Sequence, residues 1–282
     1  MRYINYNGTI LNESSPVIGA SNRGLRYGDG LFETISYKKG HFVLIEQHLN
    51  RLWHGMEMMQ FELPKLFNRA FVSEQLKKLV SKNNDNPARV RLMVFRSDGG
   101  LYDPENMKPN FIIQSWPLLT ATNELNGNGL DLCIYEDARK TCDAFANIKH
   151  NNYLPYLMGA LHAKKHHFND AVILNQEGHI CDSTIANIFI IKNNCIFTPA
   201  LHQGCVSGIM RNFLLEALPS MSYEVLETSI SVEMLLDADE VFLSNAIYNI
   251  RWVKSVESSL YGFAETQKIF YQLTKTNPNI IC

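Results

Sequence analysis

The sequence predicts an α+β fold in two domains, and three observations lead to this prediction. The chain has 282 residues, which at about 150 residues per domain allows two domains with substantial cores. Its hydrophobic fraction of 46% and charged fraction of 19% are those of an ordinary globular protein and exclude a disordered chain. Strand-like and helix-like hydrophobic patterns also occur together in both halves of the chain.

The first domain, residues 1–120, is predicted to begin with two hairpins. Asn7-Gly8 between Tyr3–Tyr6 and Thr9–Leu11 indicates a type I′ turn. Leu31–Tyr37 and His41–Ile45 flank the turn residues 38–40 in the same way. Apolar periodicity predicts the remaining elements: a helix containing Leu49, Leu52, Trp53, Met56 and Met59, a helix over Val72–Val80, and strands at Arg89–Phe95 and Asn110–Trp116.

Residues 117–129 have weak periodicity and many turn formers, so the domain boundary is placed at 120/121. The second domain, residues 121–282, is predicted to contain a strand, a helix, a four-stranded meander, two further helices and a last strand. These elements are Leu130–Tyr135, Tyr153–His167, then Ala171–Leu174, Ile180 onward, Asn187–Ile191 and Cys195–Thr198, then Ile209–Leu218 and Val232–Leu236, and Val241–Ser244.

Charge and composition argue against several classes of function. The net charge of −2 gives no global attraction to nucleic acid or to an anionic membrane. There is no apolar run of the roughly 18–20 residues that span a bilayer, and the first residues have no signal-peptide core, so we expect a cytoplasmic protein. The six scattered cysteines are expected to be buried free thiols. His162 and His166 have a helical i,i+4 spacing, but two lysines separate them, so we expect no metal site.

Three local features could carry chemistry. Tyr27-Gly28-Asp29-Gly30 is a tight turn before a strand. Gly208 precedes a predicted helix, whose first N–H groups could hold a phosphate, although on this evidence alone ordinary loop-to-helix geometry is the better explanation. Lys149 precedes the mostly uncharged stretch 151–163, where burial could lower the pKa of its amine and make it a nucleophile.

Seven segments together, from Arg26 to Val253, resemble the class IV aminotransferases, the pyridoxal-phosphate enzymes of fold type IV. This family includes branched-chain and D-amino acid aminotransferases and 4-amino-4-deoxychorismate lyases. The segments are Arg26–Thr34, His48–Leu52, Lys149–Leu154, Gly178–Phe189, Thr198-Pro199, Gly208–Arg211 and Val241–Ala246. The resemblance implies a small α/β N-terminal domain, a larger C-terminal pseudo-barrel domain, and a homodimer.

The resemblance also implies roles in binding pyridoxal 5′-phosphate. Lys149 resembles the lysine that forms the Schiff base and then moves the proton, which an amine can do in its neutral and charged forms. Arg51 resembles the arginine that binds the phosphate, and Tyr153 the tyrosine that hydrogen-bonds the phenolic oxygen. The phosphate cradles are implied at two turns, Gly208-Ile209-Met210 and Asn245-Ala246.

Two residues of the implied cofactor site depart from the family pattern. Where the family has a glutamate that holds the pyridine nitrogen protonated, this chain has Asp182. An aspartate can supply the same charge, although its side chain is one methylene shorter. At Ala246 the chain also lacks the threonine hydroxyl of the branched-chain enzymes.

The substrate and the reaction stay open between two activities. Arg96 and Tyr102, on a loop after a strand, are expected to meet a substrate carboxylate, and Tyr27 is expected to line the same site. The segment Arg96–Tyr102 only partly matches the lyase pattern, because it is one residue shorter and lacks the second arginine. We therefore favour an aminotransferase acting on an amino acid and a 2-oxo acid. The alternatives are aminodeoxychorismate lyase and a non-catalytic protein that binds the cofactor.

Overall fold

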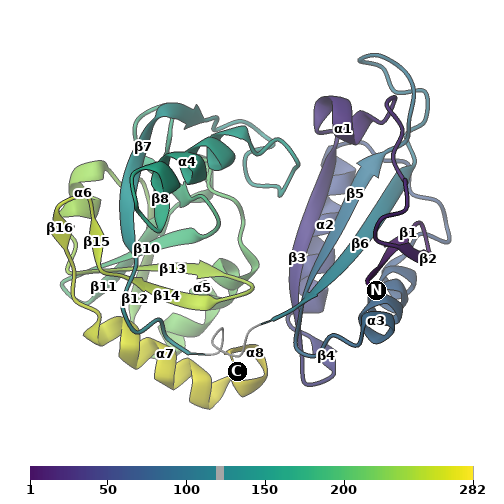
Figure 1. The fold of residues 1–282 in the computed structure, drawn as a ribbon. Coiled ribbons are helices and arrows are strands. Elements are labelled where there is room, and N and C mark those ends of the chain that lie inside the picture. Colours follow the sequence, from purple (N-terminus) through teal and green to yellow (C-terminus); the bar gives the residue numbers. More distant parts are fainter. Residues whose placement is uncertain (119–123, 282) are drawn as a thin grey trace. The chain divides into compact units, whose positions relative to one another are not determined.

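The computed structural model describes residues 1–118 and 124–281, and the chain forms two compact units (Figure 1). Unit 1 consists of Met1–Thr120 together with Ile148–Asn152, and unit 2 of Ala121–Asn147 together with Tyr153–Cys282. The boundary expected at 120/121 lies outside the described residues.

Unit 1 is built on a six-stranded antiparallel sheet with the strand order β2-β1-β6-β5-β3-β4. Its elements in chain order are β1 (Tyr3–Tyr6), β2 (Thr9–Asn12), α1 (Arg23–Tyr27), β3 (Gly30–Lys38), β4 (His41–Phe42), α2 (Ile45–Met58), α3 (Arg69–Asn83), β5 (Ala88–Arg96) and β6 (Pro109–Pro117).

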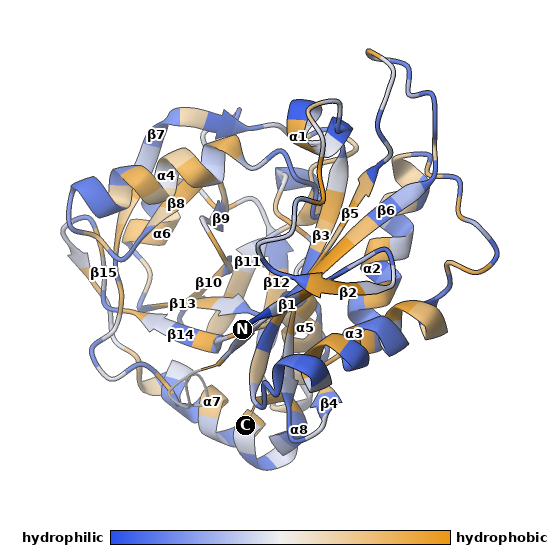
Figure 2. Ribbon diagram, turned by 45° about the vertical axis from the view of Figure 1, so that its right-hand side comes forward, coloured by the Kyte–Doolittle hydropathy of each residue, from blue (hydrophilic) through white to orange (hydrophobic). Residues whose placement is uncertain are grey.

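Helices α2 and α3 cover one face of this sheet. Alternate residues of β5, from Ala88 to Val94, share one core with Leu52 of α2 and Leu76 of α3. Alternate residues of a strand point to the same face, so both helices lie on that face. Figure 2 shows the hydrophobic residues of β3, β5 and β6 in orange.

The predicted elements of unit 1 are confirmed, with two corrections. Asn7 and Gly8 both have positive φ, as a type I′ turn requires. The strand expected at His41–Ile45 ends at Phe42, because Leu44 is left-handed and Ile45 begins α2. Helix α1 was not predicted, since its five residues are too few for periodicity. It is defined by its ends, where Asn22 caps it and Gly28 terminates it in a left-handed conformation.

Unit 2 contains two five-stranded sheets with the orders β12-β11-β10-β13-β14 and β16-β15-β7-β8-β9. Both sheets contribute to one core, which agrees with the implied pseudo-barrel. The elements are β7 (Asp131–Lys140), α4 (Leu154–Lys165), β8 (Asp170–Asn175), β9 (Ile180–Ser183), β10 (Asn187–Lys192), β11 (Cys195–Pro199), α5 (Ile209–Ser220), β12 (Glu224–Thr228), α6 (Val232–Leu236), β13 (Glu240–Asn245), β14 (Asn249–Val253), β15 (Ser255–Val256), β16 (Ser259–Leu260), α7 (Ala264–Thr276) and α8 (Pro278–Ile281).

The predicted meander in unit 2 is wrong. Strands β8 and β9 pair in one sheet, whereas β10 and β11 pair in the other. The sequence of a short strand does not show which sheet the strand joins. The same alternation of apolar and polar residues lets one face of the strand be buried in either sheet. Strand β7 also runs to Lys140, five residues beyond the predicted end, past a register shift after Tyr135.

No helix within the described ranges is long and apolar enough to cross a membrane. The five cysteines that the structure describes are free, but Cys142 is exposed, contrary to expectation. The rings of His162 and His166 lie 4.4 Å apart, and across residues 1–118 and 124–281 no three metal-binding side chains gather.

Candidate active site

The segment that carries Lys149 is bound along the first residues of β3. The N–H of Phe32 donates to the carbonyl of Lys149 at 2.9 Å, and the N–H of Asn151 donates to the carbonyl of Gly30 at 2.9 Å. We expected Lys149 to belong to the second domain. These bonds instead make Ile148–Asn152 part of unit 1, because long-range pairing with β3 outweighs position along the chain.

The glycines of the turn Tyr27–Gly30 make this binding possible. A Cβ on Gly28 would lie 2.3 Å from Oδ1 of Asn152, and a Cβ on Gly30 would lie 2.4 Å from the carbonyl of Val94 and 2.7 Å from Nδ2 of Asn151. Real atoms do not approach so closely. The turn motif therefore brings the Lys149 segment against the backbone of β3.

We expect Gly30→Ala to displace the Lys149 segment. The added methyl must push away either β5 or Asn151, which should cost about 1–3 kcal/mol of unfolding free energy and reduce turnover by about 10²-fold through misplacement of Lys149. Chemical denaturation and steady-state kinetics measure the two effects. Gly127→Ala is the control, since a Cβ there meets nothing within 4 Å. Wild-type turnover in Gly30→Ala would contradict this role.

The Lys149 side chain lies on the face of the sheet opposite the helices. Its Nζ is 4.8 Å from the ring centroid of Phe32, and the Arg91 guanidinium is 4.4 Å from the same ring. Phe32 points away from the helix-covered core, because it alternates with Leu31 and Glu33 along β3. Lys149 is half-buried, so it is not a fully solvated surface lysine.

Arg51 is held by a buried carboxylate on β3. Its Nε and Nη2 donate to Oε1 and Oε2 of Glu33 at 2.8 and 2.5 Å, and Nδ1 of His48 donates to Oε2 at 2.6 Å. The Arg51 side chain is only 11% exposed. The guanidinium is therefore fixed in one orientation.

The charges of this cluster follow from its burial. Burial alone would raise the pKa of Glu33, but Arg51 and His48 outweigh it and lower that pKa to about 2. Burial lowers the pKa of His48, and the cations of Arg51 and Lys149 add to this effect, although Glu33 opposes it. We conclude that His48 is neutral at neutral pH and that Arg51 balances the charge of Glu33.

We expect Glu33 to make stability depend on acid pH. A carboxyl whose pKa falls from 4.5 to about 2 on folding contributes about 3 kcal/mol above pH 4.5. That contribution is lost as the pH falls from 4.5 through 2. Denaturant unfolding at several pH values should therefore show a steeper acid decline for the wild type than for Glu33→Gln, and parallel profiles would refute the assignment.

In unit 2, Asp182 is a buried carboxylate that accepts three hydrogen bonds. It is 2% exposed. Its Oδ2 accepts the hydroxyl of Tyr156 at 2.8 Å and the N–H of Val206 at 3.0 Å, and its Oδ1 accepts Nδ2 of Asn187 at 2.8 Å. Nζ of Lys140 lies 3.5 Å from Oδ2. The carboxylate is thus rigid and matched by a cation.

The N-terminus of α5 follows Val206, whose N–H donates to Asp182. Gly208 is the N-cap residue of α5, and no side chain of the described residues caps the helix. The first N–H groups, at Ile209 and Met210, are therefore available in the way that suits an anion. A Cβ on Gly208 would lie 1.9 Å from Oδ1 of Asn187. Asn187 therefore joins this helix end to Asp182.

The second expected cradle lies at the end of β13. Asn245 closes the turn itself, because its Oδ1 accepts the N–H groups of Ile247 and Tyr248 at 2.9 and 2.8 Å. Its neighbour Ser244 pairs with Asn187 across the sheet. The Ser244 hydroxyl is buried and has no hydrogen-bond partner among the described residues. Ala246 is half-buried.

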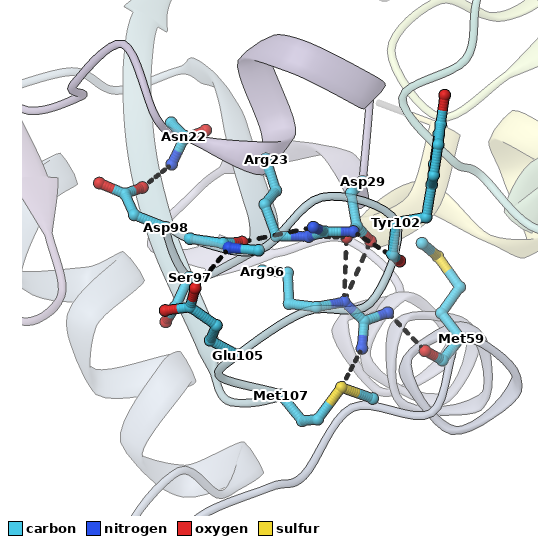
Figure 3. Close-up of polar contacts among 12 residues, drawn as sticks. Asn22, Arg23, Asp29, Met59, Arg96, Ser97, Asp98, Tyr102, Glu105 and Met107 are labelled. Atoms are coloured by element: carbon cyan, nitrogen blue, oxygen red, sulfur yellow. Dashed lines mark hydrogen bonds and ion pairs between the residues drawn. The ribbon is translucent and has the colours of Figure 1, made fainter.

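The structure gives Arg96 a different role from the one expected. Arg96 is 5% exposed, and each of its three nitrogens is bonded within unit 1 (Figure 3). Nε donates to both oxygens of Asp29, Nη1 to Sδ of Met107, and Nη2 to the carbonyl of Met59 at 2.6 Å. A guanidinium bonded in this way does not present its fork to a substrate carboxylate.

Arg23, which the sequence did not single out, completes this network. Its Nε donates to Asp29 at 2.9 Å (Figure 3), and its Nη atoms donate to the carbonyls of Leu101 and Tyr102. Two predicted substrate residues are brought together beside it: the rings of Tyr27 and Tyr102 have centroids 6.1 Å apart, and Tyr102 is 91% exposed.

Sequence reasoning missed Tyr156, Lys140, Glu33 and His48. Tyr156 could have been found, since it lies three residues after Tyr153 on the same helix face, and the two rings stack with centroids 4.6 Å apart. Glu33 and His48 stand in the quoted motifs without an assigned role. Lys140 gave no signal, because Arg139-Lys140 looks like an ordinary solvated pair.

The chain is similar in sequence to known proteins. Residues 30–256 match the family described as Amino-transferase class IV. An aminodeoxychorismate lyase of Bacillus subtilis is 29% identical over 264 residues, which are 91% of this chain and 87% of that protein. A branched-chain-amino-acid aminotransferase of Escherichia coli is 26% identical over 269 residues, which are 92% of this chain and 86% of that protein.

Solved structures share the fold. A branched-chain amino acid aminotransferase of E. coli has a TM-score of 0.88 at 25% identity, covering 98% of this chain and 94% of that one. A putative 4-amino-4-deoxychorismate lyase of Legionella pneumophila has a TM-score of 0.84 at 23% identity, covering 93% of this chain and 96% of that one.

Proposed function

Since the chain belongs to the class IV aminotransferase family, we propose that it is a pyridoxal-phosphate enzyme that transfers an amino group from an amino acid to a 2-oxo acid. Relatives named for both aminotransferase and lyase activity are enzymes. A solved relative from the branched-chain group is a complex with pyridoxamine 5′-phosphate. Lys149, held against β3, is the residue that carries the proposal.

The residues present fit this cofactor. The uncapped start of α5 suits a phosphate dianion, and the buried hydroxyl of Ser244, without a partner among the described residues, offers it a donor. Asp182 is a buried carboxylate held in place for a cationic N–H. Arg51, Tyr153, Asn245 and Ala246 remain proposed cofactor-binding residues.

Bound pyridoxal phosphate supplies an aldehyde to which amines add and a ring that withdraws electrons from the substrate Cα. The amine of Lys149 would take a proton from the substrate Cα when neutral and deliver it to C4′ of the cofactor when charged. The carboxylate of Asp182 keeps the ring nitrogen protonated, because a nearby negative charge raises the pKa of a base. Tyr27 and Tyr102 are proposed to contact the substrate.

Aminodeoxychorismate lyase is the second candidate, since relatives at 29 and 28% identity carry that name. The lyase substrate has two carboxylates, which need cationic partners. The donors of Arg96 are used within the protein, and this observation favours the aminotransferase.

A substrate panel separates the candidates. The purified protein, reconstituted with pyridoxal phosphate, is incubated with L- and D-amino acids or with aminodeoxychorismate, and the visible absorbance of the cofactor and the products are followed. Conversion of the cofactor to its amine form by an amino acid supports the aminotransferase. Release of pyruvate and 4-aminobenzoate supports the lyase. Bound cofactor that reacts with neither would indicate the non-catalytic alternative.

We also propose a homodimer. Helix α4 exposes an apolar stripe at helical spacing, in which Leu154, Leu157 and Leu161 are 66, 58 and 52% exposed. A second copy would remove such a stripe from water. Light scattering is expected to give twice the mass of the chain, and Leu157→Glu should shift it toward the monomer. A monomeric wild type at working concentration would contradict the proposal.

A further inference from the structure

Lys140, at the end of β7, is a buried lysine for which the proposed function has no use. It is 6% exposed. Its Nζ donates to the carbonyl of Ala146 at 2.9 Å, lies 3.5 Å from Oδ2 of Asp182, and is 5.3 Å from the ring centroid of Tyr156. Taking an ammonium out of water is unfavourable unless the charge is paired. Its position beside Asp182 therefore calls for an explanation.

The two carboxylate oxygens of Asp182 have different numbers of hydrogen-bond and ion-pair partners. Oδ2 faces Tyr156, Val206 and Lys140, whereas Oδ1 accepts one hydrogen bond from the described residues, that of Asn187. A carboxylate has about four acceptor positions, two on each oxygen. Oδ1 is thus the oxygen with capacity for a further N–H, and Lys140 draws the negative charge of the group toward the other oxygen.

We propose that Lys140 tunes Asp182, weakening its hold on the protonated pyridine nitrogen of pyridoxal phosphate. This inference rests on the proposed function. Because the Lys140 ammonium lies 3.5 Å from Oδ2 of Asp182, it offsets part of the negative charge of this carboxylate, so the ring nitrogen should be held protonated less firmly than it would be by an uncompensated carboxylate. Lys140 is a positioning residue, because it acts through Asp182.

A purely structural role makes a different prediction. Lys140 also donates a hydrogen bond to the carbonyl of Ala146. If this bond were its only role, removal of the Lys140 side chain would loosen residues 141–147. The binding affinity of every ligand of this shape would then fall by the same factor. Only tuning depends on whether the ligand carries a ring nitrogen.

The experiment compares two ligands of the same shape. The apo-protein is titrated with pyridoxal phosphate and with its deaza analogue, in which a C–H replaces the ring nitrogen, and the two dissociation constants are measured by fluorescence. Lys140→Met keeps the length of the side chain and removes the charge, and Lys140→Gln serves if the first variant does not fold. Lys192→Met is the control, because Lys192 pairs instead with Asp237 and Asp239.

We expect Lys140→Met to raise the preference for pyridoxal phosphate over the deaza analogue by about tenfold or more, since one pKa unit is a factor of ten, and the control to leave it unchanged. If Lys140→Met alters both affinities by the same factor, so that the preference is unchanged, or if it lowers the preference for pyridoxal phosphate, the inference is overturned. A wild type that does not bind pyridoxal phosphate at all would overturn the proposed function, and this inference with it.

Discussion

Lys149→Ala is expected to lower turnover by a factor of about 10⁴ or more. The variant lacks the amine that binds the cofactor covalently and moves the substrate proton, and Arg91, the other cation beside Phe32, stays protonated at all ordinary pH values and cannot replace it. Borohydride reduction followed by peptide mass analysis should find the phosphopyridoxyl group on the Lys149 peptide of the wild type and on no peptide of the variant.

Lys164→Ala is the matched control, since Lys164 is an exposed lysine on α4. It should retain wild-type turnover and covalent labelling at Lys149. Substantial turnover by Lys149→Ala, or labelling of another lysine in the wild type, would remove Lys149 from the proposed mechanism.

Replacing Asp182 has the second largest expected effect. Asp182→Ala should lower turnover by about 10²–10³-fold, because the carboxylate acts mainly when charge develops in the transition state. The affinity for pyridoxal phosphate should fall much less, since Lys149 and the start of α5 are unchanged. Steady-state kinetics and cofactor titration measure the two effects separately.

This variant also leaves Tyr156, Asn187 and Lys140 without their common acceptor. An unpaired buried donor costs about 1–3 kcal/mol, so the kinetics are measured well below the unfolding temperature, and Asp182→Asn, which keeps the shape, is measured beside it. Asp237→Ala, at a side chain that is 83% exposed, is the control. Equal losses of affinity and turnover in Asp182→Asn would leave the partner of the ring nitrogen unidentified.

Local pattern determined much of the fold. The Asn7-Gly8 turn, helix α2 and strands β5 and β6 were predicted because their signals lie within a few residues: a turn dipeptide, a 3.6-residue stripe, an alternation. The pairing of strands was not predicted in unit 2, since β9 and β10 are separated only by a short turn and yet belong to different sheets. Which sheet a strand joins depends on partners far along the chain.

The candidate site divides in the same way. By itself, the sequence determined the family resemblance, the choice of Lys149 and Asp182, and the glycine before α5, because each stands in a short motif. Only the tertiary structure decided how the charges are matched. In the folded protein, Arg51 pairs with Glu33 and Lys140 lies beside Asp182. Arg96 donates its hydrogen bonds to Asp29 and to backbone carbonyls. The physical reason is that a buried charge must find its partner in space, and these partners lie 18 to 67 residues apart along the chain.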